Sequence, residues 1–387
     1  MKRETTAEPT GCRWQLVNGV HGVNIFTLDE QMRQSIFLPL APFLLMQNSE
    51  PIATESDQLV RAAWLYYIGG NTQEQTAEIL GVSRVKVARL LAEAREAGIV
   101  KISIEHRFGP MAEVEETIRR HYGLDFCRTT PPLLSDSVEH PAKMLPPAKL
   151  ADEGPVARRA VAMVAVELLR ERMQVDEECV IGVGWGRTTA EIARSLPAMR
   201  RPQAKFVSVM GSLTRNLAAN LFEVVHHLAA KTGGEGHFLP VPFIANTVAD
   251  RQILMSQRIV QETLALAEKA NFYLISVGEC DERAFLFENR YLSAQELNEL
   301  RKAGAVGDTM GKFFNAQGEV VSSDLNDRTL AIDLEALRKH EVILLCGGRS
   351  KLRPAQGILK TGFVNGLLID GDSASQMFHE ITAARET

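Results

Sequence analysis

Short apolar runs alternate with helical segments over residues 156–387, and no other feature of the sequence restricts the fold as much. The predicted strands are 179–183, 205–210, the residues around 236–240, 271–277, 328–332, 342–346 and 366–369. The predicted helices include 156–173, the segment after Arg187, 216–231 and one long helix, 250–270. Apolar strands bracketed by helices are typical of a parallel sheet covered on both faces. We therefore predict a doubly wound, mostly parallel α/β domain that binds ligands beyond the carboxyl ends of its strands.

Residues 71–98, NTQEQTAEILGVSRVKVARLLAEAREAG, have the pattern of two short helices joined by a tight turn. Thr72 and Gln75 have the spacing of a capping box, and Gly81 permits a sharp turn. Ser83 is placed to cap the second helix. The residues predicted to face inward are Ala77, Ile79, Leu80, Val87, Leu90, Leu91 and Ala94. The pattern predicts a helix-turn-helix, although an ordinary pair of helices with solvated charges has the same spacing.

Three neighbouring features favour DNA binding over the ordinary helical pair. The aromatic segment 57–69 provides a first helix for packing, and the alternating, β-branched segment 99–105 is typical of a wing. Arg84 and Lys86 lie at the N-terminal end of the second helix, which usually meets base edges. Residues 57–107 carry 7 Lys or Arg against 6 Asp or Glu, a net charge of only +1, so affinity depends on local placement and on more than one copy. The predicted DNA contacts are Thr72, Gln73, Ser83, Arg84, Lys86, Val87 and Arg89.

Composition excludes several other classes of protein. The 387 residues are 45% hydrophobic and 24% charged, with a net charge of −5, as in a globular protein of two or three domains and not a basic nucleic-acid coat. The 5 cysteines are scattered without a CxxC pair, which indicates reduced thiols in a cytoplasmic protein. The apolar stretch 36–46 is too short to span a bilayer. We predict no cofactor, no metal site and no membrane association.

Three further segments complete the predicted organisation. Residues 1–55 match no recognisable element, and an ordered extension, an oligomerisation arm or an upstream start codon would each explain them. Segment 109–122 predicts a helix whose apolar stripe pairs with a partner subunit or caps the next domain. Segment 131–155 is rich in Pro, Ser and Asp and predicts a loop or linker. The predicted divisions are an extension at 1–55, a helix-turn-helix domain at 56–108, a connecting helix and linker at 109–155, and an α/β effector domain at 156–387.

Loops of small residues follow three of the predicted strands: GVGWGRTT at 182–189, MGSL at 210–213 and GGRSK at 347–351. Small residues let backbone N–H groups approach an anion, and a following helix N-terminus favours negative charge. Close packing explains the glycines equally well in any single loop. Because the loops share one edge of the sheet, we predict a small-molecule site there. Its predicted residues are Gly184, Gly186, Arg187, Thr188, Thr189, Gly211, Ser212, Gly347, Gly348 and Lys351.

Four residues outside these loops complete the predicted ligand site. Asp308, in GAVGD, is placed to accept hydrogen bonds from sugar hydroxyls, although it also suits the cap of a turn. Asn246 and Asp250 bracket a loop before the long predicted helix, where they serve either as lid residues or as helix caps. Gly278 directly follows the strand predicted at 271–277.

The ordered motifs carry a resemblance to a known family. The residues VRAAWLYYIGGNTQEQTAEILGVSRVKVARLLAEAREAGIVKISI, followed by VIGVGWGRT, VMGS, GAVGD and GGRSK, resemble the SorC/DeoR-type sugar-binding transcriptional regulators from about residue 57 onward. The resemblance implies an N-terminal helix-turn-helix and an effector domain akin to sugar-phosphate isomerases and deaminases. It also implies homo-oligomers, commonly tetramers, that bind double-stranded operator DNA and respond to a sugar, polyol or sugar phosphate. The GWGRT, GS and GGRSK loops would hold the effector, with Asp308 and Lys351 as pocket residues.

Two functions of different classes follow from these observations. In the first, the protein regulates a carbohydrate or polyol catabolic operon, and the effector changes how the subunits present their recognition helices. In the second, the α/β domain is a sugar-phosphate isomerase or deaminase, with Asp308 as general base. The sequence offers no clustered Asp, Glu and His set for proton transfer, so we predict a regulator and not an enzyme.

Overall fold

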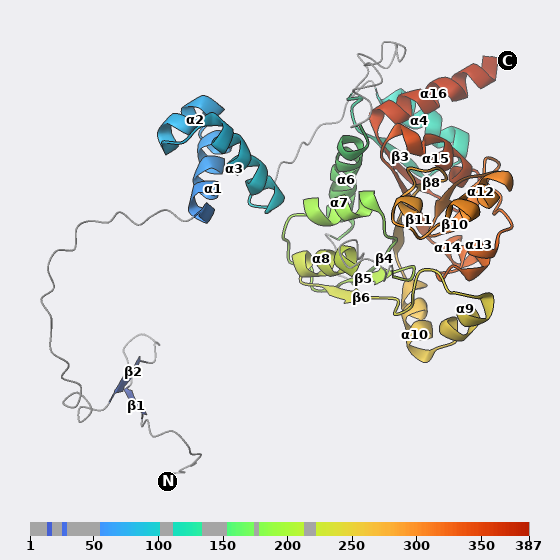
Figure 1. Cartoon of the computed structure of the whole chain (residues 1–387), viewed down its shortest axis with the longest axis horizontal. Helices are drawn as coiled ribbons and strands as arrows, with labels where there is room; N and C mark the ends of the chain where they lie inside the picture. Colours follow the sequence, from blue (N-terminus) through green and yellow to red (C-terminus); the bar gives the residue numbers. More distant parts are fainter. Residues whose placement is uncertain are drawn as a thin grey trace, which may run out of the picture. The chain divides into compact units, whose positions relative to one another are not determined.

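The computed structural model describes residues 14–17, 25–28, 55–100, 111–133, 153–173, 178–212 and 222–386. The chain divides into two units, Met1–Glu93 and Ala94–Thr387 (Figure 1). Within the N-terminal extension, β1 (Trp14–Val17) pairs antiparallel with β2 (Ile25–Leu28). In the part of the chain that the structure describes, there is no helix long and apolar enough to cross a membrane.

The first unit contains α1 (Glu55–Ala63), the π-helical turn η2 (Trp64–Ile68), α2 (Gln73–Leu80) and α3 (Arg84–Glu96). The predicted capping box is confirmed, because Gln75 N–H donates to Thr72 Oγ1 at 3.2 Å and Thr72 N–H donates to Gln75 Oε1 at 2.8 Å. Gly81 ends α2 in the left-handed region with φ 64°. Ser83 Oγ accepts from Lys86 N–H at 3.2 Å, as its predicted capping role requires.

The core of these three helices is small. Its fully or nearly buried residues are Ala62, Ala77, Val87, Leu90 and Leu91, and the aromatic rings of Tyr66 and Tyr67 pack against them. Ile79 was predicted to face inward and is instead 54% exposed, because the core is completed by Leu80 and Val82 on either side of the turn. The wing predicted at 99–105 lies almost wholly outside the described residues.

The second unit is built on a parallel sheet of seven strands in the order β3-β12-β11-β7-β4-β5-β6. The strands are β3 (Phe126–Thr129), β4 (Cys179–Val183), β5 (Ala204–Ser208), β6 (Glu235–His237), β7 (Phe272–Ser276), β11 (Glu341–Cys346) and β12 (Gly366–Ile369). Each neighbouring pair is parallel. The predicted α/β class and its mostly parallel sheet are therefore confirmed.

Alternate residues of each strand enter cores on opposite faces of the sheet. In β7, Phe272 and Leu274 pack with one cluster, whereas Tyr273 and Ile275 pack with the other. Helices α6 (Glu153–Arg172), α7 (Arg187–Ser195) and α8 (Phe222–Thr232) supply the first cluster. The second is supplied by α4 (Met111–Tyr122), α10 (Arg258–Ala267), α12 (Ala294–Lys302), α15 (Leu352–Leu359) and α16 (Gly371–Glu386). Burial on both faces explains why the strands are apolar throughout.

The effector domain begins earlier than the predicted residue 156. Met111, Val114 and Ile118 of α4 are buried in the core of the sheet, and α4 lies beside α16 (Figure 1). The chain then enters the sheet as β3, which pairs with β12 from Phe126↔Gly366 to Thr129↔Ile369. The apolar stripe on this helix thus caps the domain, and of the predicted linker only 131–133 and 153–155 are described.

Three other element predictions need correction. The helix predicted at 250–270 is two helices, α9 (Val248–Met255) and α10, because Ser256 and Gln257 donate side-chain hydrogen bonds to Ile253 O and interrupt the helical ladder. The strand predicted at 328–332 forms only isolated bridges after α13 (Asp324–Arg328). A small antiparallel sheet, unpredicted, joins β8 (Gly278–Glu279), β9 (Ala305–Thr309) and β10 (Lys312–Asn315).

Candidate ligand site

The carboxyl ends of β4 and β7 lead into a cavity of about 40 Å³, which we call the inner cavity. Its apolar wall comes from Trp185, Met210, Phe285, Leu286 and Met310, and its polar wall from Arg187, Glu279, Asp308 and Lys351. Two of these charged groups lie on β8 and β9, so the small antiparallel sheet completes the site. The structure brings together Gly186, Arg187, Gly278, Asp308 and Lys351 of the predicted residues.

Glu279 is the central charged group and is only 6% exposed. Arg187 Nη2 donates to both of its carboxylate oxygens, at 3.0 Å and 3.2 Å. Ser350 Oγ donates to Oε1 at 2.9 Å. Sequence reasoning missed Glu279, although an acidic residue directly after Gly278 at a strand end was an available signal.

Lys351 and Asp308 face the same carboxylate from two sides. Burial lowers the pKa of Lys351, which is 3% exposed, while the charge of Glu279 acts to raise it. Burial raises the pKa of Asp308 to about 7, with Glu279 adding to this shift and the Gly311 N–H donor opposing it. That N–H donates to Asp308 Oδ2 at 3.1 Å. The site therefore holds a carboxyl group that changes its charge near neutral pH.

Two glycines of the predicted set are required by close approach. A Cβ atom on Gly278 would lie 2.0 Å from Asp308 Oδ1, and one on Gly186 would lie 2.1 Å from Ser276 Oγ. Real Cβ atoms do not come so close to other heavy atoms. Glycine at 278 thus lets the Asp308 carboxyl group occupy its place at the cavity.

Several predicted ligand residues have their polar groups engaged elsewhere. Gly184 N–H donates to Leu274 O at 2.8 Å, and Thr189 Oγ1 donates to Gly186 O at 2.9 Å. Thr188 is fully buried and does not line the inner cavity. Gly348 N–H donates to Asp370 Oδ2 at 2.7 Å. Gly347 packs against the backbone of Arg158, so these five residues shape the loops without lining the cavity.

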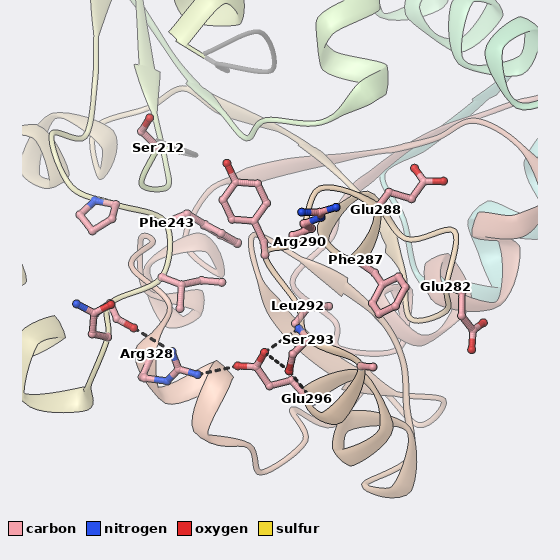
Figure 2. A pocket seen from close by; sticks show the side chains of 16 residues that line it. Ser212, Phe243, Glu282, Phe287, Glu288, Arg290, Leu292, Ser293, Glu296 and Arg328 are labelled. Carbon is pink, nitrogen blue, oxygen red and sulfur yellow. Dashed lines mark hydrogen bonds and ion pairs between the residues drawn. The ribbon is translucent and has the colours of Figure 1, made fainter. Parts of the chain in front are cut away.

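Ser212 and Asn246 line a different, open cavity of about 750 Å³, which we call the outer cavity. Figure 2 shows its side chains, with dashed lines from Arg328 to Glu296 and from Glu296 to Ser293. Gly211 packs against Pro242 O. Asp250 lines neither cavity: it lies in the first turn of α9, and its N–H donates to the capping Thr247 Oγ1 at 3.0 Å.

Trp185 and the short helix α11 (Phe285–Glu288) lie between the two cavities. Ala284, Phe285 and Leu286 line the inner cavity, whereas Phe287 and Glu288 line the outer one. Trp185 Nε1 donates to Gly211 O at 3.2 Å, and its ring meets Phe243 edge to face with centroids 4.7 Å apart. The ring centroid of Phe285 is 5.9 Å from that of Trp185.

The predicted DNA-contact residues fall into two groups. Arg84 and Arg89 are exposed, and they pair with Glu74 at 3.0 Å and with Glu93 at 3.3 Å. Thr72, Gln73, Ser83 and Lys86 lie at the surface near them. Val87 is 0% exposed, so its side chain belongs to the helical core and cannot contact DNA.

The chain is similar to proteins of known families. The family described as "Putative sugar-binding domain" matches residues 106–379. The erythritol catabolism regulatory protein EryD of Brucella abortus is 32% identical over 327 residues, covering 84% of this chain and 98% of that protein. The deoxyribonucleoside regulator of Bacillus subtilis is 28% identical over 331 residues, which cover 84% of this chain and 99% of that protein. The full-length sorbitol operon regulator SorC of Klebsiella pneumoniae has a similar fold, with a TM-score of 0.57 at 22% identity over 83% of this chain and 98% of that one.

The fold defines an α/β protein with a polar cavity at the carboxyl edge of a parallel sheet. The family match and the 32% identity define it more narrowly. The chain belongs to the SorC/DeoR-type family of sugar-binding transcriptional regulators, and it is a regulator and not an enzyme.

Proposed function

We propose that the protein is a DNA-binding regulator of a carbohydrate or polyol catabolic operon. Its effector is a sugar, polyol or sugar phosphate that binds at the inner cavity. One observation carries the proposal: four charged side chains from separate elements converge on one cavity within the domain that matches the sugar-binding family. Buried polar groups that converge in a cavity are the usual means of orienting a small ligand.

In this proposal, the first unit binds DNA as a winged helix-turn-helix. Its second helix, α3, exposes Arg84 and Arg89, which form surface ion pairs with Glu74 and Glu93. Such pairs contribute little to stability, so both guanidinium groups can turn to phosphate or base edges at small cost. Thr72, Gln73, Ser83 and Lys86 complete the proposed contact surface.

Effector binding requires a change in the effector domain. The inner cavity, at about 40 Å³, is close to the ~30 Å³ that one water molecule occupies in the liquid, so a sugar enters only if α11 moves toward the outer cavity. A homo-oligomer, a tetramer as in the family, then exchanges between two arrangements with different effector affinities. That difference is the thermodynamic requirement for regulation.

Fluorescence anisotropy with DNA from upstream of its own gene tests the proposal. We expect binding to labelled DNA that one member of a panel of pentoses, hexoses, tetritols and their phosphates weakens or strengthens. The same compound should raise the melting temperature, because a ligand that prefers the native state stabilises it. Sedimentation velocity reports the oligomeric state in the same samples.

Lys351→Ala separates the two halves of the proposal. The variant should bind DNA as the wild type does and lose the response to the effector, because the cavity loses its buried ammonium group. Lys339→Ala, which removes an exposed lysine outside both cavities, is the matched control and should respond normally. A normal response in Lys351→Ala would place the effector elsewhere, and a protein that binds no DNA would refute the regulator proposal itself.

A further inference from the structure

The structure already places an anion between the cations of the inner cavity. Glu279 accepts hydrogen bonds from Arg187 and Ser350 and faces Lys351. We propose that the effector is therefore an uncharged polyhydroxylated molecule, a polyol or free sugar, and that Glu279 makes the site reject phosphate esters. This inference rests on the proposed function and specifies its effector.

The position of Glu279 is fixed by the fold. Its backbone lies in β8, where it pairs with Gly307 of β9 in an antiparallel register. The side chain is 6% exposed, and both carboxylate oxygens have donors. The carboxylate cannot turn into solvent to make room for an anion without losing these bonds. It acts as a permanent counter-ion for Arg187.

The charges around the inner cavity are balanced. Of the charged groups that line the inner cavity, two are cations, Arg187 and Lys351, and two are carboxyl groups, Glu279 and Asp308. With Asp308 ionised their sum is zero, and with Asp308 protonated it is +1. A sugar phosphate carries a charge of about −1.5 to −2 at pH 7, so its binding would leave the site with a net negative charge in either state of Asp308.

A phosphate group and a hydroxyl group differ in the hydrogen bonds that they can form with the side chains of this site. A phosphate dianion only accepts hydrogen bonds, so it would either lie against the Glu279 carboxylate, which repels it, or displace that carboxylate from Arg187 and leave it unpaired. Removing one partner of a buried ion pair is strongly unfavourable. A hydroxyl group both donates and accepts, so a polyol can donate to Glu279 and Asp308 while accepting from Lys351, and no ion pair is broken.

Isothermal titration calorimetry with matched pairs of compounds tests the inference on the wild-type protein. The pairs are erythritol with erythritol 4-phosphate, ribose with ribose 5-phosphate, and fructose with fructose 6-phosphate, with inorganic phosphate titrated separately. For the pair that binds, we expect the uncharged member to bind about tenfold or more tightly than its phosphate. Tighter binding of the phosphate ester would overturn the inference.

Glu279→Gln tests whether this carboxylate sets the preference. Glutamine keeps the size and an acceptor for Ser350 but removes the charge, so the ratio of the two affinities should shift toward the phosphate by about tenfold or more. Glu178→Gln, which removes an exposed carboxylate paired with Lys205, should leave the ratio unchanged. If the Glu279→Gln protein melts normally and its ratio of affinities for the uncharged compound and the phosphate is unchanged, Glu279 does not set the preference. If the variant does not fold, the ratio measured on the wild-type protein still tests the inference.

These outcomes are distinguishable from a failure of the proposed function. If no member of any pair binds and DNA binding does not respond to any compound, the regulator proposal with a sugar site fails. If a phosphate ester binds tightly and changes DNA binding, the proposed function stands and only the inference about charge is lost.

Discussion

Two ion pairs with the same separation, 3.0 Å, lie in very different surroundings. Arg84 of α3 and Glu74 of α2 join these two helices of the first unit, with side chains 66% and 60% exposed. Arg187 and Glu279 lie at the edge of the parallel sheet, 28% and 6% exposed. The first pair interacts through water and the second through a medium of lower dielectric constant, where attraction and desolvation are both larger.

The difference separates the roles of the two regions. The exposed arginine keeps its hydration and changes partner at little cost, which suits a surface that must exchange ion pairs for DNA phosphates. The buried pair is held by the fold and determines what the cavity accepts. Four predictions would break or sharpen this comparison, and they run from the largest expected change in free energy to the smallest.

Glu279→Ala should lower the free energy of unfolding of the effector domain by about 2–3 kcal/mol, because it leaves Arg187 and Lys351 without their counter-ion. Arg187 is 28% exposed, so water moderates the loss. Glu74→Ala is the matched control in the exposed pair and should change stability by about 0.5 kcal/mol or less. Urea denaturation followed by near-ultraviolet circular dichroism measures both, and equal losses would mean that burial does not distinguish the pairs.

Asp308 should make stability depend on pH. The pKa of Asp308 is about 7 in the folded protein, above its usual value. At a pH between these two pKa values, the folded state therefore binds a proton at Asp308 that the unfolded state has released. Its stabilising contribution is complete below the unfolded pKa and is lost as pH rises to about 7, with a slope of up to about 1.4 kcal/mol per pH unit.

The charged groups that face Asp308 are Glu279 and Lys351. Asp308→Asn should remove the pH-dependent difference, so the gap in stability between wild type and variant should change between pH 5 and pH 7 and stay level above pH 8. Thermal unfolding at a series of pH values measures this gap. A constant gap across the series would show that Asp308 does not titrate in this range.

Arg84→Ala should weaken operator binding by about tenfold and reduce the salt dependence by about one counterion. Its stability should barely change, since the pair with Glu74 is exposed. Arg258→Ala, which removes a 92% exposed arginine paired with Glu262 in the effector domain, serves as the control. Anisotropy titrations at several salt concentrations compare the two, and unaltered binding by Arg84→Ala would remove this residue from the interface.

Thr72→Ala should destabilise the first unit by about 1 kcal/mol, because the first turn of α2 loses its side-chain acceptor. Thr263→Ala, in which the hydroxyl donates to Ile259 O within α10, should have a smaller effect, since alanine favours the helix interior. Calorimetric scans of both variants give the comparison. A Thr72→Ala protein as stable as the wild type would mean that the cap contributes nothing.

Local patterns made much of the fold predictable. Six of the seven predicted strands correspond to strands of the parallel sheet, and β4, β7, β11 and β12 among them are almost wholly apolar and buried. The capping box at Thr72 and the turn at Gly81 depend on neighbours within a few residues. The strand β3, by contrast, is short and only partly apolar, and its place at the sheet edge comes from pairing with β12 some 240 residues later.

The residues of the candidate site also divide into those that the sequence identified and those that only the structure revealed. The sequence by itself placed Arg187 and Lys351 in loops after predicted strands, because the carboxyl edge of a parallel sheet gathers such loops, and it singled out Asp308 without a predicted strand. Only the tertiary structure showed that Glu279 lies among them and that Thr188 is buried away from the cavity. Whether a polar side chain meets a ligand, a backbone carbonyl or another charge depends on partners far along the chain, and a local pattern carries no information about them.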